Sequence, residues 1–373
     1  MSTAAPLRAR STELGRGVHI VLPGQTPAGE HVLSVLLKRS YDISPERRCQ
    51  RAPEDRPLVP GDVFWDSPMN SSVRYESDFV PFKLGTDVVL NGQVHAPGGE
   101  ATYSCSAFLQ VADRAKEIVV IGNRTARYAG GATPVFSDPE PFQTMEMRYE
   151  RAYGGTDVFS DPSSIYPYPN NPLGCGFALS NTKTAVENLP LPNIEDPNDL
   201  LTPERLCIGA YANWKNQPLP AGFGWYPKTW MARAKYAGIM PADRAFEQEM
   251  RQEYAKLLSA DQRATYLKHG IRDMDFSFFQ GASRGLAMPY LAGNEEIWTE
   301  NLSPDGRVHF ALPAEAPQIG LDIGNGVQTP PTQLQTVMIH MEERQLDLVW
   351  RCAVPYPGRD WLPEMQKMEV HVQ

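Results

Sequence analysis

Between residues 19 and 121, short apolar segments alternate with turns rich in proline, glycine, asparagine and aspartate. This pattern is typical of β-strands joined by turns. The strands that it predicts are 19–22, 32–41, 72–79, 87–90, 101–111 and 117–121. The apolar residues at 88–90 and 118–121 are consecutive, so we expect these two strands to be covered on both faces and to form the core of a β-sandwich.

The segment between residues 125 and 240 has few periodic stretches but many prolines and aromatic residues. A long stretch without repeating structure in a compact domain is usually made of ordered, functional loops. The density of aromatic side chains argues against disorder. We therefore predict an irregular region that packs on the sheets. Four aromatic residues are candidates for a partner-binding surface, with core packing as the alternative: Trp214, Trp225, Tyr226 and Trp230.

A helical period is clear in one place, between residues 241 and 270. Phe246, Met250, Tyr254 and Leu257 recur at spacings of three and four, which places them on one face of a helix. Asp243 is positioned to cap this helix. The β pattern returns after residue 270 and predicts strands at 275–279, 295–301, 307–312, 336–341 and 345–350.

Together these patterns predict a mainly β (α+β) fold, in which β-sandwich-like sheets carry long ordered loops and a helical insertion. The predicted organisation is a disordered tail at 1–16, an N-terminal β-rich lobe at 17–124, the irregular region at 125–240, the helical insertion at 241–270 and a C-terminal β-rich lobe at 271–373. The sequence is equally compatible with two separate β-rich lobes and with one intertwined unit.

Charge and cysteine usage narrow the classes of partner and the compartment. The net charge of −9 repels nucleic-acid phosphates and anionic membranes, and no basic cluster offsets it. The cysteines are widely separated and include no C-x-x-C pair, which is typical of a reducing compartment. Residues 1–16 lack the apolar run of a signal peptide, and no apolar run approaches the ~18 residues of a membrane span. We expect a soluble, cytoplasmic protein that binds neither nucleic acid nor membrane.

Motifs for cofactors and metals are missing from the sequence. It has no nucleotide-binding fingerprint, and we predict neither a cofactor nor a metal. Two sets of residues offer ligand chemistry without the spacing of a specific metal motif: His340 with Glu342 and Glu343, and His269 with Asp273 and Asp275. Solvated charges at strand and helix ends explain both sets.

Cys175 is the candidate nucleophile. The turn Gly174-Cys-Gly176 would present its thiol at an accessible position, where a distant histidine could activate it. An ordinary turn that requires glycine is the alternative interpretation.

Charged residues occur in and beside segments that are predicted to be packed. Lys83 and Asp87 precede a buried strand, Arg124 follows another, and Glu150 and Arg151 lie between aromatic residues. Charges at such positions are tolerated when they are paired and hydrogen-bonded. They form either a salt-bridged network that fixes loops to the sheets or a recognition surface.

These charged segments belong to an ordered series of motifs that covers nearly the whole chain. The series includes Met147-Arg-Tyr-Glu-Arg-Ala-Tyr-Gly-Gly155 and Asn171-Pro-Leu-Gly-Cys-Gly176. Its other members lie at 75–92, 119–124, 141–142, 191–195, 230–233, 236–238, 275–283, 291–295, 310–313 and 348–351. With this series the chain resembles the bacterial family catalogued as domain of unknown function 2169. The signature residues, structural or partner-binding, are Lys83, Asp87, Gly92, Arg124, Glu150, Arg151, Gly154, Gly155, Asn171, Pro172, Gly174, Gly176, Pro192 and Asn193.

The resemblance implies a role in type VI secretion. The protein would be a non-enzymatic adaptor and chaperone that holds a cognate effector and helps to load it onto the PAAR/VgrG spike. Relatives often have an aspartate where this chain has Asn123, so no role is carried over for an acidic residue there. Two other functions stay open: a cysteine-dependent enzyme that uses Cys175 on an effector or a cell-wall fragment, and a structural component of the spike or baseplate. The client, the binding face and the oligomeric state are not specified.

Overall fold

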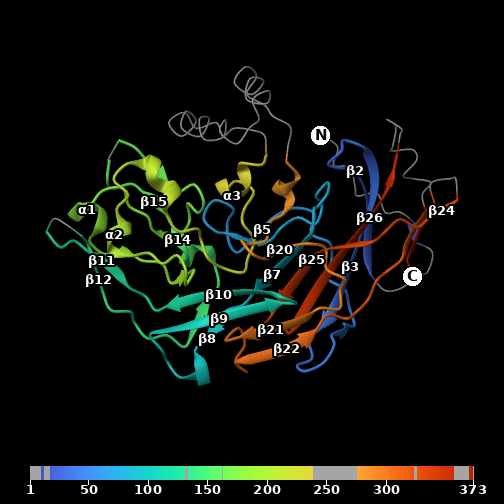
Figure 1. Ribbon diagram of the computed structural model, residues 1–373, viewed down its shortest axis with the longest axis horizontal. Coiled ribbons are helices and arrows are strands. Elements are labelled where there is room, and N and C mark those ends of the chain that lie inside the picture. Colours follow the sequence, from blue (N-terminus) through green and yellow to red (C-terminus); the bar gives the residue numbers. More distant parts are fainter. Residues whose placement is uncertain are drawn as a thin grey trace, which may run out of the picture.

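The computed structural model describes residues 10–11, 17–130, 133–161, 163–237, 275–322, 326–356 and 369–372. Its architecture is mainly β, with several sheets and few helices, which confirms the predicted fold class (Figure 1). The predicted helical insertion at 241–270 lies outside the described residues. Within them, no helix combines the length and the apolar character that crossing a membrane requires.

A seven-stranded sheet contains the longest strands. Its order is β2-β3-β26-β25-β7-β20, with β4 paired to the end of β3. β7 and β25 are parallel, whereas the other neighbours are antiparallel. The bounds are β2 (Val18–Gln25), β3 (His31–Asp42), β4 (Gln50–Arg51), β7 (Thr86–Asn91), β20 (Ala287–Met288), β25 (Gln333–His340) and β26 (Gln345–Pro355).

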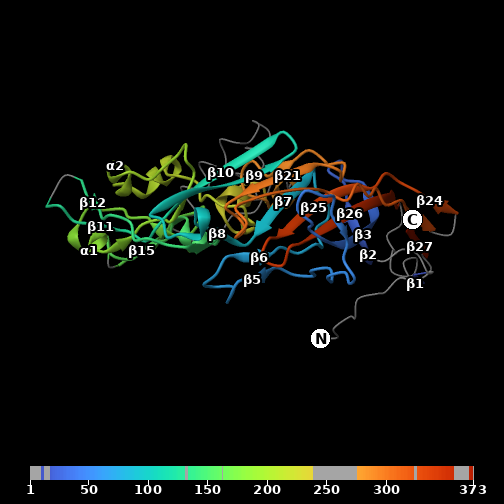
Figure 2. The ribbon, with the colours of Figure 1, turned by 90° about the horizontal axis from the view of Figure 1, so that it is seen from below.

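A five-stranded sheet packs over this first sheet. Its strands are, in order, β19 (Ile194–Glu195), β10 (Arg114–Ile121), β9 (Ser104–Val111), β21 (Glu296–Glu300) and β22 (Arg307–Ala311). One continuous core cluster contains Val88 and Val337 from the first sheet together with Leu109, Val120 and Phe310 from the second. Figure 2 shows the two layers from the side, with β9, β10 and β21 over β7, β25 and β26. The arrangement is a β-sandwich.

Each sheet contains strands from both ends of the chain. β3 is hydrogen-bonded to β26, and β9 is hydrogen-bonded to β21. The two β-rich parts of the sequence therefore form one intertwined sandwich.

Two local predictions were wrong. β10 is covered on one face only, because Ile118 and Val120 are buried whereas Val119 and Ile121 are half-buried. The predicted strand at 275–279 is instead the 3₁₀ helix η4 (Phe276–Phe279). Asp275 caps this helix, since its side chain accepts a hydrogen bond of 2.9 Å from the Ser277 N–H. All six residues of β7 are buried, as the consecutive apolar pattern predicts.

Residues 55–81 cover the second face of the seven-stranded sheet, the face opposite the sandwich core. Lys38 lies 3.4 Å from Asp78 across this contact. Arg351 donates a hydrogen bond of 2.8 Å to the carbonyl of Pro81. Lys38 is therefore buried with a carboxylate partner and Arg351 is buried with hydrogen-bond acceptors, which are the conditions under which buried charge is tolerated. This covering segment contains β5 (Val63–Phe64) and β6 (Val73–Tyr75).

The irregular region has a hydrophobic core of its own, separate from the sandwich core (Figure 1, green and yellow). The rings of Tyr153 and Tyr168 meet edge-to-face with centroids 5.1 Å apart, and Phe177 and Trp214 pack beside them. The short elements around this second core are η2 (Tyr149–Arg151), β11 (Thr125–Arg127), β12 (Val135–Phe136), β14 (Tyr153–Gly154), β15 (Thr156–Asp157), β16 (Tyr166–Pro167), β17 (Cys175–Gly176), β18 (Leu189–Pro190), α1 (Lys183–Val186), α2 (Pro203–Leu206), η3 (Tyr211–Asn216) and α3 (Met231–Ala234).

A small sheet joins segments from the two ends of the chain. Its order is β1 (Arg10–Ser11), β27 (Glu369–Val372), β23 (Ile319–Asp322) and β24 (Val327–Gln328). The prediction of a disordered tail is therefore wrong for Arg10 and Ser11, which pair with Glu369 and Val370. The remaining short elements are β8 (Gln93–His95), β13 (Thr144–Glu146) and η1 (Pro97–Gly99).

A buried ion pair fixes the loop after η4 to β7. Lys83 Nζ lies 2.6 Å from Asp87 Oδ2, and the two side chains are 4% and 0% exposed. Asp87 also accepts hydrogen bonds from the backbone N–H groups of Gly281 at 3.0 Å and Ala282 at 3.2 Å. These two signature residues therefore have a structural role.

Replacing Lys83 with methionine leaves the Asp87 carboxylate buried without its counter-ion. We expect the free energy of unfolding to fall by about 3–5 kcal/mol, measured by chemical denaturation. Arg307→Met is the matched control, because it removes a largely exposed pair with Glu300 and should cost less than about 1 kcal/mol. Equal, small losses in the two variants would contradict the structural role of the buried pair.

Lys116 on β10 reaches across the end of the sandwich. Its Nζ donates hydrogen bonds to Ser283 Oγ at 2.8 Å and to the Arg284 carbonyl at 2.9 Å. Burial lowers the pKa of Lys116 to about 7, and the nearby charge of Arg284 lowers it further against the attraction of Asp196.

This lowered pKa predicts a pH-dependent stability. Between about pH 7 and the ordinary lysine pKa of 10.5, the unfolded chain binds a proton that the folded chain does not, so the penalty that this group imposes on folding shrinks as the pH rises through that window. Lys116→Met should therefore raise the Tm relative to the wild type at about pH 6, and the gain should shrink by about pH 9. A Tm difference that is constant across this range would contradict the lowered pKa.

Candidate functional site

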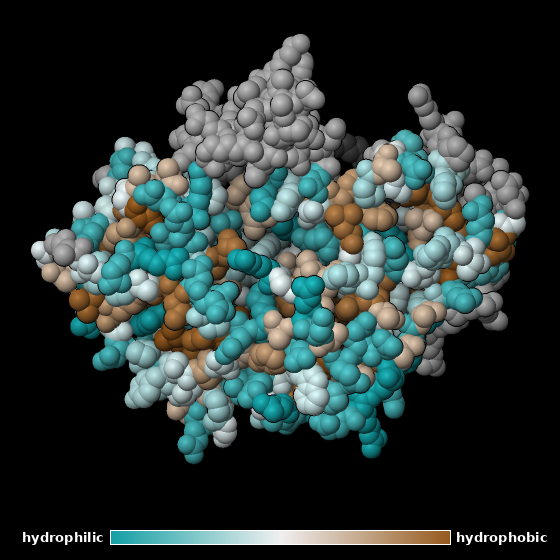
Figure 3. All heavy atoms as spheres, viewed as in Figure 1, coloured by the Kyte–Doolittle hydropathy of each residue, from teal (hydrophilic) through white to brown (hydrophobic). Residues whose placement is uncertain are grey.

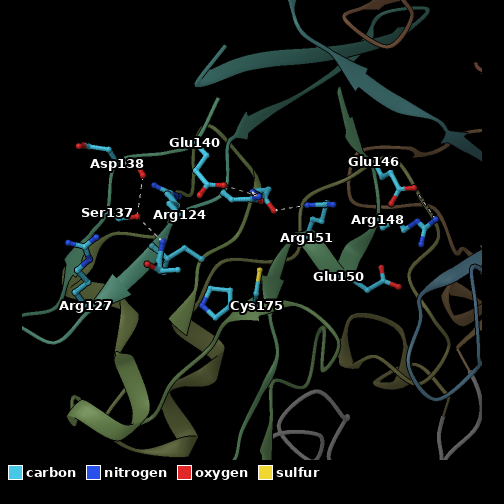
Figure 4. A pocket seen from close by; sticks show the side chains of 15 residues that line it. Arg124, Arg127, Ser137, Asp138, Glu140, Glu146, Arg148, Glu150, Arg151 and Cys175 are labelled. Carbon is cyan, nitrogen blue, oxygen red and sulfur yellow. Dashed lines mark hydrogen bonds and ion pairs between the residues drawn. The ribbon is translucent and has the colours of Figure 1, made fainter. Parts of the chain in front are cut away.

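An open cleft with a volume of about 840 Å³ lies where the end of β10 meets the irregular region. It is lined by polar and charged side chains from β11, η2, β17 and the connections between them (Figure 4). The residues that line it are Asn123, Arg124, Thr125, Arg127, Ser137, Asp138, Glu140, Glu146, Arg148, Glu150, Arg151, Cys175, Pro190, Leu191 and Asn193.

The structure brings most of the signature residues to this cleft. Arg124, Glu150, Arg151 and Asn193 line it directly. Other signature residues pack against the backbone that carries the wall residues Arg151 and Cys175. They are Gly154, Gly155, Asn171, Pro172, Gly174, Gly176 and Pro192. Lys83, Asp87 and Gly92 lie apart, in and beside the seven-stranded sheet.

Glycine is required under the cleft because two backbone segments touch there. β14 and β17 pair in parallel, with Gly154 opposite Gly176. A Cβ on Gly154 would lie 2.1 Å from the Asn171 carbonyl oxygen, which is closer than any real contact. Gly176 has a φ of +92°, a conformation that only glycine adopts without strain. The two segments can approach this closely only without side chains.

Asn171 stabilises the contact between these two backbone segments through hydrogen bonds. Its side-chain amide is fully buried and donates hydrogen bonds to the carbonyls of Tyr149 at 2.7 Å and Tyr153 at 3.1 Å. Its own carbonyl accepts a hydrogen bond of 2.8 Å from Gly155. The carbonyl of Pro172 accepts a hydrogen bond of 3.1 Å from Thr156 Oγ1. The Asn-Pro pair therefore fixes the turn that leads into β17.

Arg124 forms an ion pair with Glu195 across 71 residues of sequence. Burial raises the pKa of Glu195, although a hydrogen bond of 2.6 Å from the Leu201 N–H and the charge of Arg124 act in the opposite direction. The guanidinium of Arg124 also lies 5.5 Å from the ring centroid of Phe136. This pair joins the start of β11 to β19.

Glu150 joins the wall of the cleft to the covering segment of the sandwich. Its two carboxylate oxygens accept hydrogen bonds from the N–H and the hydroxyl of Ser72 at 2.7 and 2.8 Å. The neighbouring Arg148 pairs with Glu146 at 3.2 Å and lies 4.6 Å from the ring centroid of Trp65. Both charges are therefore engaged within the chain.

Arg151 differs from these neighbours. Its side chain donates one hydrogen bond, of 3.3 Å, to Asn193 Oδ1. In the part of the chain that the structure describes, no carboxylate lies within ion-pair distance of its guanidinium. The Asn193 side-chain amide is itself held by the Ile121 carbonyl at 2.9 Å and by Asn123 Oδ1 at 3.2 Å.

Cys175 is half-buried in the wall of the cleft. Burial raises the pKa of its thiol to about 12, and the negative charge of Glu195 contributes in the same direction. No histidine is among the described residues that line the cleft. A thiol that stays protonated and lacks an adjacent base is a poor nucleophile.

The candidate metal ligands that lie among the described residues do not assemble into a metal site. The ring of His340 is buried and hydrogen-bonded to Asp347 at 3.1 Å. Among the described residues, no group of three or more histidine, cysteine, aspartate or glutamate side chains is placed to hold a metal ion. Of the other candidate set, His269 and Asp273 lie outside the described residues.

Of the two interpretations of the four aromatic candidates, a partner surface and core packing, their burial supports core packing. Trp214, Trp225, Tyr226 and Trp230 are at most 8% exposed. Trp214 belongs to the core of the irregular region, Trp225 to the sandwich core, and Tyr226 and Trp230 to a third cluster around Tyr149. Their density reflects core packing because large rings fill the space between irregular loops.

Several residues of the site are absent from the predicted set. Glu195 and Arg148 lie within recognised motifs, and their charge at packed positions was the signal that could have identified them. Arg127 and Ser72 have no such signal, because only the tertiary structure brings them to the cleft and to Glu150.

The fold and the cleft define a β-sandwich protein with an open polar cleft, built where an irregular region joins the sheets. The chain belongs to the bacterial family described as uncharacterized protein conserved in bacteria (DUF2169), whose model matches residues 28–351. No curated protein and no solved structure matches the chain.

Gly154→Ala tests the close contact under the cleft. The added Cβ must displace the Asn171 carbonyl, so we expect the free energy of unfolding to fall by about 3 kcal/mol. Gly61→Ala is the matched control, because a Cβ there meets nothing within 4 Å and should change stability by less than about 0.5 kcal/mol. Equilibrium denaturation of both variants measures the difference, and a neutral Gly154→Ala would disprove the required close approach.

Proposed function

We propose that this protein is a non-enzymatic adaptor and chaperone of type VI secretion, which binds a cognate effector and helps to load it onto the PAAR/VgrG spike. The role is the one implied by the resemblance of the sequence motifs to this family, and the membership of the chain in the family supports it. In this role the protein acts by holding another protein in a fixed geometry.

The observation that carries the proposal is how the signature residues are used. Arg124 and Glu150 tie separate segments together through Glu195 and Ser72. The glycines and Asn171 hold the backbone beneath an open polar cleft. A rigid frame around an open surface suits protein binding, because a preorganised surface loses little conformational freedom when it binds.

The alternative of a cysteine-dependent enzyme is less well supported. It requires a reactive thiol at Cys175, whereas burial raises the pKa of that thiol to about 12. We therefore assign Cys175 no catalytic role in this proposal.

The direct test is co-expression of the protein with each effector and each PAAR protein that is encoded beside its gene. We expect one of these proteins to co-purify in a fixed stoichiometry and to become more soluble than when it is expressed alone. Cys175→Ser is the matched control and should leave both effects unchanged. If the serine variant bound normally but abolished secretion, the enzyme alternative would replace the adaptor.

Cell fractionation separates the adaptor from a structural component of the spike. An adaptor should remain in the producing cell when the effector is secreted, whereas a spike or baseplate component should be secreted or retained in the assembled particle. Absence of any association with the neighbouring proteins would contradict the proposal.

A further inference from the structure

We infer that the cleft binds a polypeptide segment of a partner protein that carries an aspartate or glutamate side chain, and that Arg151 is the principal anchor for this carboxylate. The inference rests on the proposed function, because it names the chemistry by which the adaptor would recognise its client. It is carried by the balance of hydrogen-bond donors and acceptors in the cleft wall.

The arginines of the cleft have more hydrogen-bond donors than the described residues supply acceptors. A guanidinium has about five N–H donors. Arg124, Arg148 and Arg151 each use one of them in a side-chain hydrogen bond to the described residues. The Nε atoms of Arg124 and Arg148 are buried without a partner. A ligand that offers oxygen acceptors would satisfy this surplus of donors.

The carboxylates around the cleft leave Arg151 free for such a ligand. Glu195 pairs with Arg124, Glu146 pairs with Arg148, and both oxygens of Glu150 are held by Ser72. Among the described residues, the Arg151 guanidinium donates a hydrogen bond only to the neutral side-chain amide of Asn193. Figure 4 shows Arg151 among the side chains that line the cleft. A guanidinium that has no carboxylate partner can form two strong, parallel hydrogen bonds with the carboxylate of a ligand.

The rest of the lining favours a polypeptide over a polyanion. Asp138 and Glu140 are exposed at the cleft, and the chain as a whole has a net charge of −9, so a nucleic acid or a polyphosphate would be repelled. A polypeptide segment offers backbone N–H groups to these two carboxylates and an acidic side chain to Arg151. The volume of about 840 Å³ lies within the range of pockets that enclose ligands of this size.

The position of Arg151 is fixed before a ligand arrives. Its backbone carbonyl accepts a hydrogen bond of 2.8 Å from the Asn193 N–H. The chain three residues further on is held by the contact between Gly154 and Asn171. The anchor therefore loses little conformational freedom on binding, which strengthens a contact made by a single side chain.

Selection of random heptapeptides displayed on phage tests the chemistry of the cleft without a known client. The wild-type protein should enrich sequences that contain aspartate or glutamate, and Arg151→Gln should lose this enrichment. Arg127→Gln removes a second guanidinium that is exposed and has no side-chain partner among the described residues, so it should weaken the enrichment without any structural effect. Arg307→Gln, on the far edge of the five-stranded sheet, is the matched control and should select as the wild type does.

A selected peptide then gives the size of the effect. Its Kd, measured by fluorescence anisotropy, should rise at least about 10-fold in Arg151→Gln and should not change in Arg307→Gln. The isosteric replacement of glutamate by glutamine in the peptide should weaken binding to the wild type by a similar factor. Absence of acidic enrichment, or equal enrichment on Arg151→Gln with an unchanged Tm, would overturn the inference.

The two proposals fail in different ways. If an effector co-purifies and Arg151→Gln does not weaken that complex, the adaptor stands and the cleft is not its acid-binding site. If acidic peptides bind through Arg151 but no effector or PAAR protein associates, the cleft chemistry stands and the secretion role is wrong.

Discussion

The contact on which the cleft depends is the close approach of two backbone segments, 152–155 and 171–176. At Gly154 and Gly174 the distance to the opposite segment leaves no room for a Cβ. The fully buried side-chain amide of Asn171 holds the two segments together, because it donates hydrogen bonds to two backbone carbonyls of the facing segment. Arg151 and Cys175 stand directly beside this contact. Their positions in the cleft wall therefore follow from the glycines behind them.

Buried charges connect the separate parts of the molecule. Lys83 with Asp87 holds a loop against β7, Arg124 with Glu195 joins β11 to β19, and Arg233 donates a hydrogen bond of 2.7 Å to Glu76 between α3 and the covering segment. The pairs of Arg124 and Arg233 join segments distant in sequence, whereas Lys83 lies four residues from Asp87, whose carboxylate also holds Gly281 and Ala282. If one partner of such a pair is removed, the other is left as a buried charge without a counter-ion, which is strongly unfavourable. The intact pair adds little net stability. These pairs therefore act mainly by disfavouring other arrangements of the segments that they join.

The sequence predicted the sheets better than it predicted the site. The apolar pattern identified most of the long strands because a strand in a sandwich is read from its own residues. It failed at 275–279, where Asp275 caps a 3₁₀ helix formed by the four residues that follow it. It could not decide between core and surface for Trp225 or Trp230, since burial of a ring in a loop depends on what packs over it. The ion pairs were foreseen as a class, but the partner of Arg124 lies 71 residues away, a distance that no local pattern spans.

The charged signature residues could serve structure or recognition, and the geometry divides them between the two. The charges of Lys83, Asp87, Arg124 and Glu150 are each paired or hydrogen-bonded within the same chain, so these charges are used in folding. Arg151 occupies an equally fixed position but has only an amide for a partner among the described residues. A guanidinium costs conformational entropy to hold in place and forms stronger bonds to carboxylates than to amides. The arrangement is therefore better suited to an acceptor that comes from another molecule than to any acceptor within the cleft.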